Sequence, residues 1–155
     1  MTSRLIGIRE NGALDCVRFL LQQGIAVRIR VSGRSMLPLL QGDELIEIVP
    51  VHKKRIKIGD ILLFCDKQGN PLVHRLHKRR YENNVLVVQT KGDACPGFDT
   101  PVPADQVLGS VQCIFDERQN INLHHSFERL KSRLIVFYTF TLFLLRRVII
   151  FFKIY

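Results

Sequence analysis

Six short runs rich in β-branched residues constrain the fold of this 155-residue chain more than any other feature. The runs cover residues 26–31, 44–49, 61–65, 72–77, 85–90 and 107–114. Glycine, proline, asparagine and aspartate separate them, and these residues favour turns. No repeat of 20 to 50 residues is visible, which argues against a propeller or a solenoid. The pattern therefore predicts a mainly β domain over residues 26–115.

A helix is predicted before this domain, within residues 1–25. Residues 10–23 place Leu14, Val17, Leu20 and Leu21 at helical spacing, and Gly24 follows as a stop signal. The segment is amphipathic and lacks the charged start, apolar middle and small-residue cleavage site of a secretory signal. We therefore expect a packing helix at this end of the chain.

The net charge of +9 is concentrated near the C-terminus, where residues 126–155 carry six basic side chains and one acidic one. Residues 134–145 contain no charge, but these twelve residues are too few to span a bilayer. After a polar connection at residues 116–126, we expect a helix over 134–155 that lies on an anionic membrane surface. Packing on the domain or on a partner subunit is the alternative, and no nucleic-acid partner is expected.

The cysteines and histidines favour neither a metal site nor a redox motif. The four cysteines contain no C-x-x-C pair, so free thiols are expected. His74 and His77 are three residues apart within a predicted strand, a spacing that directs them to opposite faces. No cofactor is predicted.

A serine directly follows the first predicted strand, in the run Val31-Ser32-Gly33-Arg34-Ser35-Met36-Leu37-Pro38. Gly33 removes a side chain that would crowd the Ser35 hydroxyl and the neighbouring backbone N–H groups. A nucleophile with an oxyanion hole has these requirements, although serine and glycine are common in any turn.

This run resembles the nucleophile box of the signal peptidase I and LexA-like serine peptidases. Three later segments are similar to the family's other boxes and occur in the same order. They are Lys57-Ile58-Gly59-Asp60-Ile61-Leu62-Leu63-Phe64, then Leu72-Val73-His74-Arg75-Leu76, then Thr90-Lys91-Gly92-Asp93-Ala94-Cys95 with Asp99 beyond it. The resemblance implies a LexA/signal peptidase-like β-fold and a catalytic domain over residues 26–115.

The resemblance also implies roles for individual residues. Ser35 would be the nucleophile and His74 the general base, as in the Ser-His type of this family; most bacterial and LexA-like members carry lysine at the base position. Lys91 is a less favoured base because it belongs to a different box. Asp93 or Asp99 would orient the imidazole, and Asp93 is preferred because it lies inside the Lys-Gly-Asp turn. The backbone amides of Gly33, Arg34 and Ser35 would form the oxyanion hole.

The implied function is a serine endopeptidase of the signal peptidase type that cleaves an extended peptide or leader segment at or near a membrane. The chain lacks the hydrophobic helix that usually precedes the serine box in this family. We expect the enzyme to associate with a bacterial inner membrane through residues 134–155. Because no hydrophobic helix precedes the serine box, we favour the cytoplasmic face of that membrane. One alternative is a non-catalytic module that keeps the fold and binds a membrane or a partner. A LexA-like autoproteolytic regulator ranks last, because no DNA-binding helix-turn-helix and no Ala-Gly cleavage site are found.

Overall fold

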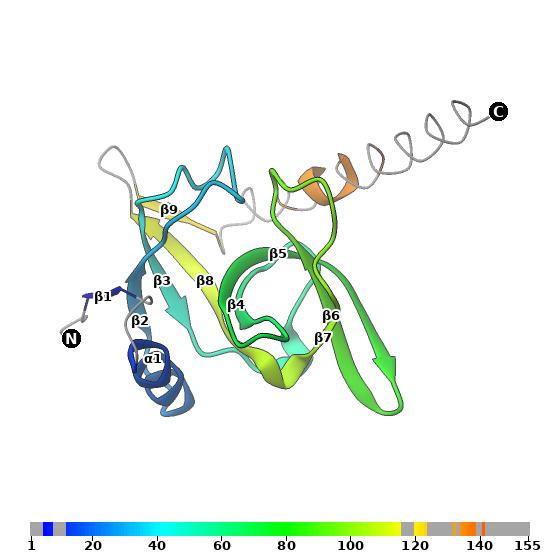
Figure 1. Ribbon diagram of the computed structural model, residues 1–155, viewed down its shortest axis with the longest axis horizontal. Coiled ribbons are helices and arrows are strands. Elements are labelled where there is room, and N and C mark those ends of the chain that lie inside the picture. Colours follow the sequence, from blue (N-terminus) through cyan, green and yellow to red (C-terminus); the bar gives the residue numbers. More distant parts are fainter. Residues whose placement is uncertain are drawn as a thin grey trace.

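The protein is described here by a computed structural model, which places residues 5–7, 12–115, 120–123, 132, 134–138 and 141. Its strands are β1 (Leu5–Gly7), β2 (Val27–Arg30), β3 (Leu45–Val49), β4 (Ile61–Cys65), β5 (Pro71–Glu82), β6 (Val85–Lys91), β7 (Val102–Pro103), β8 (Val107–Phe115) and β9 (Asn120–Asn122). Within these residues the strands form one sheet in the order β1-β2-β3-β8-β4-β5-β6-β7, with β9 added to β8. All described pairs are antiparallel except β1 with β2. The sheet curls around β4 and β5 (Figure 1). Strands make up more of the structure than helices, so the prediction of a mainly β chain is confirmed.

The six predicted strands correspond to β2, β3, β4, β5, β6 and β8. The largest difference is at β5, which continues to Glu82 although the prediction ended at residue 77. The extension pairs with β6 as a long hairpin whose turn residues, Asn83 and Asn84, both have positive φ. Two consecutive residues with positive φ match the strand twist at a two-residue turn, and asparagine tolerates that backbone region.

Three short strands were not predicted. β1 lies in the region where only a helix was expected, and β7 pairs with the middle of β6. β9 lies within residues 116–126, where only a polar connection and no strand was predicted. Its residues pair with the end of β8, from Cys113 to Phe115. Strands of two or three residues offer too little alternation to be detected in a sequence.

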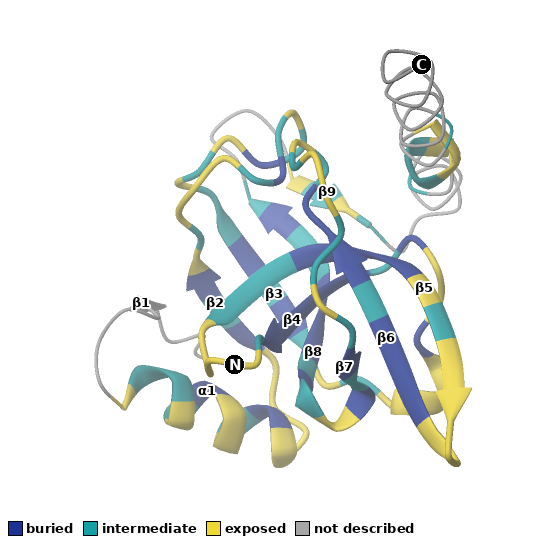
Figure 2. Ribbon diagram, turned by 45° about the vertical axis from the view of Figure 1, so that its right-hand side comes forward, coloured by how far each residue is buried: buried dark blue, intermediate teal, exposed yellow. Residues whose placement is uncertain are grey.

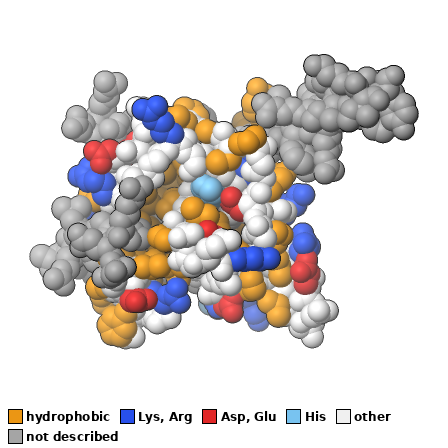
Figure 3. Space-filling view, in the orientation of Figure 1, with side chains coloured by type: hydrophobic (Ala, Val, Ile, Leu, Met, Phe, Trp, Pro, Cys, Tyr) orange, Lys and Arg blue, Asp and Glu red, His pale blue; other side chains and the backbone are white. Residues whose placement is uncertain are grey.

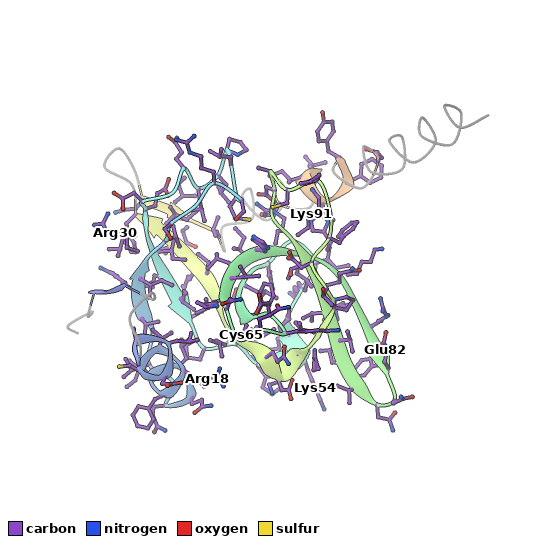
Figure 4. The ribbon with its side chains drawn as sticks, in the orientation of Figure 1. Arg18, Arg30, Lys54, Cys65, Glu82 and Lys91 are labelled. Atoms are coloured by element: carbon purple, nitrogen blue, oxygen red, sulfur yellow. The ribbon has the colours of Figure 1, made fainter. Side chains whose placement is uncertain are left out.

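The predicted N-terminal helix is α1 (Ala13–Gln22), which packs on the sheet through buried Val17 and Leu21. Gly24, with φ of 79°, follows the helix and donates its N–H to the Leu21 carbonyl. Arg18 Nη2 lies 3.7 Å from Cys65 Sγ on β4, and both residues are labelled in Figure 4. All four cysteines are free, as predicted.

Two hydrophobic cores lie on opposite sides of β4, and all five of its residues are buried. Side chains alternate along a strand, so Ile61 and Leu63 enter the core under α1, β2, β3 and β8. Leu62 and Phe64 enter the core enclosed by β5, β6 and β7. Figure 2 shows the buried residues along the central strands and exposed residues on α1 and at the β5–β6 hairpin tip. This central position explains why β4 is an uninterrupted apolar run.

The predicted C-terminal helix over residues 134–155 is described only at 134–138 and 141, where the backbone is helical. The rest of that prediction lies outside the described residues. Leu134, Phe137 and Tyr138 are exposed. In the part of the chain that the structure places, no helix is long and apolar enough to cross a lipid bilayer.

Candidate active site

Ser35 lies in a turn between β2 and β3 that is held at both ends. Before the turn, the Val31 N–H donates to the Glu44 carbonyl at 3.0 Å. After Ser35, Met36 and Leu40 are buried in the core under α1, and the Leu40 N–H donates to the Met36 carbonyl. Ser35 itself is half-buried. The apolar residues therefore fix the turn from below and leave the serine side chain free to meet another element.

That element is β5, which carries His74 to the serine. Ser35 Oγ lies 3.0 Å from His74 Nε2, and His74 Nδ1 lies 2.7 Å from Asp99 Oδ2. The His74 side chain is only 7% exposed and lies against the Phe64 ring, at a centroid distance of 6.3 Å. Figure 3 shows a histidine side chain near the centre of one face, with an acidic side chain beside it and hydrophobic side chains around it. Three residues from three distant parts of the sequence thus form one hydrogen-bonded chain.

Asp99 is held by β6 in a position where its carboxylate can only accept hydrogen bonds. The Asp99 N–H donates to the Thr90 carbonyl at 3.0 Å, and Thr90 Oγ1 donates to Asp99 Oδ2 at 2.7 Å. Gln89 Nε2 donates to the Asp99 carbonyl at 3.1 Å. Burial raises the pKa of Asp99, but the hydrogen bonds from His74 and Thr90 outweigh burial and leave the pKa below its usual value.

The ionised state of Asp99 determines which nitrogen of His74 carries the proton. An ionised carboxylate accepts and never donates, so the Nδ1 of His74 must be the donor in the bond to Asp99. In a neutral imidazole the other nitrogen, Nε2, then carries the lone pair. This lone pair faces the Ser35 hydroxyl, as a general base requires.

The preference for Asp93 as the partner of His74 is wrong, because Asp93 pairs with Arg75. Arg75 Nε donates to Asp93 Oδ1 at 2.8 Å, and Nη2 donates to Oδ2 at 2.6 Å. The Arg75 side chain is fully buried, and that of Asp93 is 4% exposed. A buried guanidinium requires a bidentate acceptor, and Asp93 supplies both oxygens. An arginine inside a predicted strand, with an aspartate in a later box, was the signal in the sequence for this pairing.

The turn at residues 92–95, which contains Asp93, contacts both Ser35 and His74. The Ala94 N–H donates to the Ser35 carbonyl at 2.8 Å. A Cβ atom on Gly92 would lie 2.7 Å from that same carbonyl oxygen and 3.1 Å from His74 Nε2. Only glycine fits such an approach, so Gly92 sets the spacing between the serine turn and the histidine. Its role was not recognised in the sequence, where it served only to identify the Lys-Gly-Asp box.

The backbone on the N-terminal side of Ser35 has the features expected of an oxyanion hole. Gly33 has a φ of 101°, a region that side chains other than glycine rarely adopt. Among the described residues, the N–H groups of Arg34 and Ser35 have no hydrogen-bond acceptor. Lys91, the less favoured base, lies at the end of β6 (Figure 4), and His74 takes the position beside Ser35.

A groove of about 680 Å³ opens beside Ser35 and His74. Its apolar lining comes from buried and half-buried residues of the serine turn, β4 and β5: Val31, Met36, Leu40, Leu63, Leu72 and Val73. Its polar lining comes from exposed residues: Arg30, Ser32, Asp43 and Asn70. The Ser35 hydroxyl therefore faces a space large enough to hold several residues of a peptide.

Comparison with known proteins finds no matching family model, no matching curated protein and no matching solved structure. Within the described part of the chain, no group of three histidine, cysteine, aspartate or glutamate side chains is arranged to hold a metal ion.

His77 lies on β5, three residues after His74. It is buried and has no hydrogen-bond partner on either ring nitrogen among the described residues. Its ring meets the Phe98 ring edge-on, with centroids 5.4 Å apart. Burial lowers the pKa of His77 to about 4, and the positive charge of Lys91 acts in the same direction. His77 is therefore a neutral side chain at neutral pH. Its ring packs against Phe98, the residue before Asp99 in the sequence.

Acid should destabilise the protein through His77. Below about pH 6.5 the unfolded chain protonates this histidine, whereas the folded chain keeps it neutral until its pKa of about 4. The unfolded state binds more protons in this interval, so the free energy of unfolding should fall by roughly 2 kcal/mol between pH 7 and pH 4.5. Urea unfolding of His77→Phe should show a smaller decrease over the same interval.

A histidine-to-phenylalanine change at the exposed residue His52 is the matched control. It should leave the pH dependence of the wild-type protein unaltered, because this side chain is solvated in the folded and the unfolded chain. An equal decrease in His77→Phe and in the wild type would contradict the assignment of the acid sensitivity to His77.

Proposed function

We propose that this chain is a serine endopeptidase of the signal peptidase type, with Ser35 as nucleophile and His74 as general base. The observation that supports this proposal is the hydrogen-bonded chain from Ser35 Oγ through His74 to Asp99, which opens into the groove. Asp99 takes the role of the orienting carboxylate. The four boxes of the sequence resemblance and the curled antiparallel sheet support a LexA/signal peptidase-like β-fold for the domain.

In the acylation step, the proton of the Ser35 hydroxyl passes through His74 to the leaving amine. His74 Nε2 removes the proton of the Ser35 hydroxyl as Oγ attacks the carbonyl carbon of the scissile peptide bond. Asp99 stabilises the imidazolium that forms, through the hydrogen bond to Nδ1. The imidazolium then donates its Nε2 proton to the leaving amine, the C–N bond breaks, and the acyl group remains on Ser35.

Hydrolysis of the acyl-enzyme uses the same groups in a second cycle. His74 takes a proton from water as the water oxygen attacks the ester carbonyl. The bond between the carbonyl carbon and Ser35 Oγ then breaks, His74 donates its proton to Oγ, and the carboxylic acid product leaves. In both steps negative charge develops on the carbonyl oxygen. The N–H groups of Arg34 and Ser35, which have no acceptor among the described residues, are the donors that would stabilise this charge.

An extended peptide is the substrate that suits the groove. β5 pairs with β4 over residues 71–75, whereas its described pairing with β6 begins only at Arg75. The edge of residues 71–74 that faces away from β4 is therefore open next to His74. A peptide can add to such an edge by backbone hydrogen bonds and direct alternate side chains into the apolar part of the groove.

We also propose that the C-terminal segment holds the enzyme at an anionic membrane surface. Its described helical residues expose Leu134, Phe137 and Tyr138, and basic residues follow in the sequence at 146, 147 and 153. Apolar side chains combined with basic charge are typical of helices that lie in a membrane interface.

A serine-reactive fluorophosphonate probe separates the enzyme from a non-catalytic membrane-binding module. We expect the probe to label the wild-type protein, because His74 activates Ser35, and not to label Ser35→Ala. Labelling is read by intact-protein mass spectrometry, and co-sedimentation with anionic vesicles measures membrane binding in the same preparation. Vesicle binding without any labelling of Ser35 would favour the non-catalytic module.

A further inference from the structure

The turn before β3, at residues 41–43, is organised by one carboxylate. The backbone N–H groups of Gln41, Gly42 and Asp43 donate to the Glu44 side chain at 2.6, 2.9 and 3.1 Å. Partial burial raises the pKa of Glu44, but these backbone hydrogen bonds lower it and leave it below the usual value. Glu44 is thus an ionised acceptor that gathers three consecutive backbone donors.

This turn lies directly against the backbone of the serine turn. Gly42 has a φ of 102°, and a Cβ atom at this position would clash with the Gly33 carbonyl oxygen and lie 3.2 Å from the Gly33 nitrogen. The two glycine backbones are therefore in contact, with no side chain between them. Any shift of residues 41–43 displaces Gly33, which is two residues before Ser35.

Two further hydrogen bonds close the connection between the turns. The Val31 N–H donates to the Glu44 carbonyl at 3.0 Å, and Arg30 Nη1 donates to the Asp43 carbonyl at 2.7 Å. The segment before Ser35 is therefore bound to the Glu44 turn through its strand end and through Gly33. By contrast, no side chain supports the N–H groups of Arg34 and Ser35 in the described part of the chain.

We propose that Glu44 is a positioning residue for the oxyanion hole: it fixes the turn at residues 41–43, which in turn holds Gly33 and the amides of Arg34 and Ser35. This role rests on the proposed peptidase function. Glu44 does not touch the reacting atoms, and its effect is transmitted through the Gly42–Gly33 contact. Preorganised donors stabilise a transition state only when they are held in place before the reaction.

Steady-state kinetics of the full-length Glu44→Ala protein test this role. We expect kcat for peptide hydrolysis to fall roughly 10- to 100-fold with KM changed less than about 2-fold, because the amides matter most when the oxyanion forms. Glu44→Gln keeps one acceptor oxygen and should recover part of kcat. Gly42→Ala, which leaves Glu44 intact but places a Cβ against Gly33, should reproduce the loss of kcat.

Glu47→Ala is the matched control, because Glu47 lies three residues after Glu44, on β3, and instead pairs with Arg28. It should keep the wild-type kcat. Hydrogen exchange provides a readout that needs no turnover. The amides of Leu37 and Ala94, which donate to the Arg34 and Ser35 carbonyls, should exchange faster in Glu44→Ala and at the wild-type rate in Glu47→Ala. Circular dichroism confirms that each variant is folded at the assay temperature.

The inference is overturned if Glu44→Ala retains the wild-type kcat and amide exchange, or if Glu47→Ala loses as much activity. It is also overturned if the loss appears in KM alone, which would indicate a substrate-binding role. Failure of the peptidase function has a different signature, since Ser35→Ala would then hydrolyse the peptide as fast as the wild type. The exchange of the Leu37 and Ala94 amides in Glu44→Ala would still report on the serine turn.

Discussion

Replacing Ser35 with alanine is expected to lower kcat for peptide hydrolysis roughly 10⁴-fold or more, and His74→Ala should lower it by a similar factor. The reason is the 3.0 Å contact between Ser35 Oγ and His74 Nε2, which makes the two residues one chemical unit. Without the hydroxyl no acyl-enzyme forms, and without the imidazole the hydroxyl keeps its proton. The measurement is kcat and KM on a peptide that the wild-type protein cleaves.

The double variant makes this prediction sharper. Because the residues act together, Ser35→Ala/His74→Ala should be no less active than either single variant. Additive losses would indicate that the two side chains act in separate steps. His52→Ala removes an exposed histidine and serves as the control that should retain full activity. Full activity of Ser35→Ala would exclude the peptidase assignment.

The regular part of the fold was predictable because its signals are local. Turn-forming residues separate the apolar runs, so β2, β3, β4, β6 and β8 occur within one or two residues of their predicted positions. The full length of β5 was missed because charged residues at 78–80 interrupt the apolar pattern, yet they pair with β6 on a half-exposed face. The very short strands β7 and β9 depend on a neighbouring strand and carry no pattern of their own.

The site was predictable to the level of residue types and order, and not to the level of pairing. The resemblance placed Ser35, His74 and two aspartates in one region, and the structure brings Ser35 and His74 together. The choice between Asp93 and Asp99 depended on Arg75. This residue follows His74 on β5, is buried, and donates two hydrogen bonds to Asp93. Glu44 and Gly92 act through backbone contacts, and such contacts leave no distinctive motif in one sequence.

The two aspartates should respond differently to the same isosteric change. Asp99→Asn should lower kcat by roughly 10²- to 10⁴-fold, because an amide in place of the carboxylate no longer fixes the Nδ1–H tautomer of His74 or stabilises its charge. Its stability should change little, since asparagine can still accept the hydrogen bond from Thr90. The measurements are kcat and the urea unfolding midpoint for each variant.

Asp93→Asn should instead affect the free energy of unfolding. It leaves the fully buried Arg75 guanidinium with a neutral partner, and breaking a buried pair in this way typically costs about 3–5 kcal/mol. Arg75 Nη1 also donates to the Gly59 carbonyl and to Ser132 Oγ, so the loss should loosen the contact between β5 and the C-terminal segment as well. Where Asp93→Asn remains folded, its kcat should exceed that of Asp99→Asn. A stable Asp93→Asn protein with the lower kcat of the two would restore Asp93 as the partner of His74, against the hydrogen bonds that the structure shows.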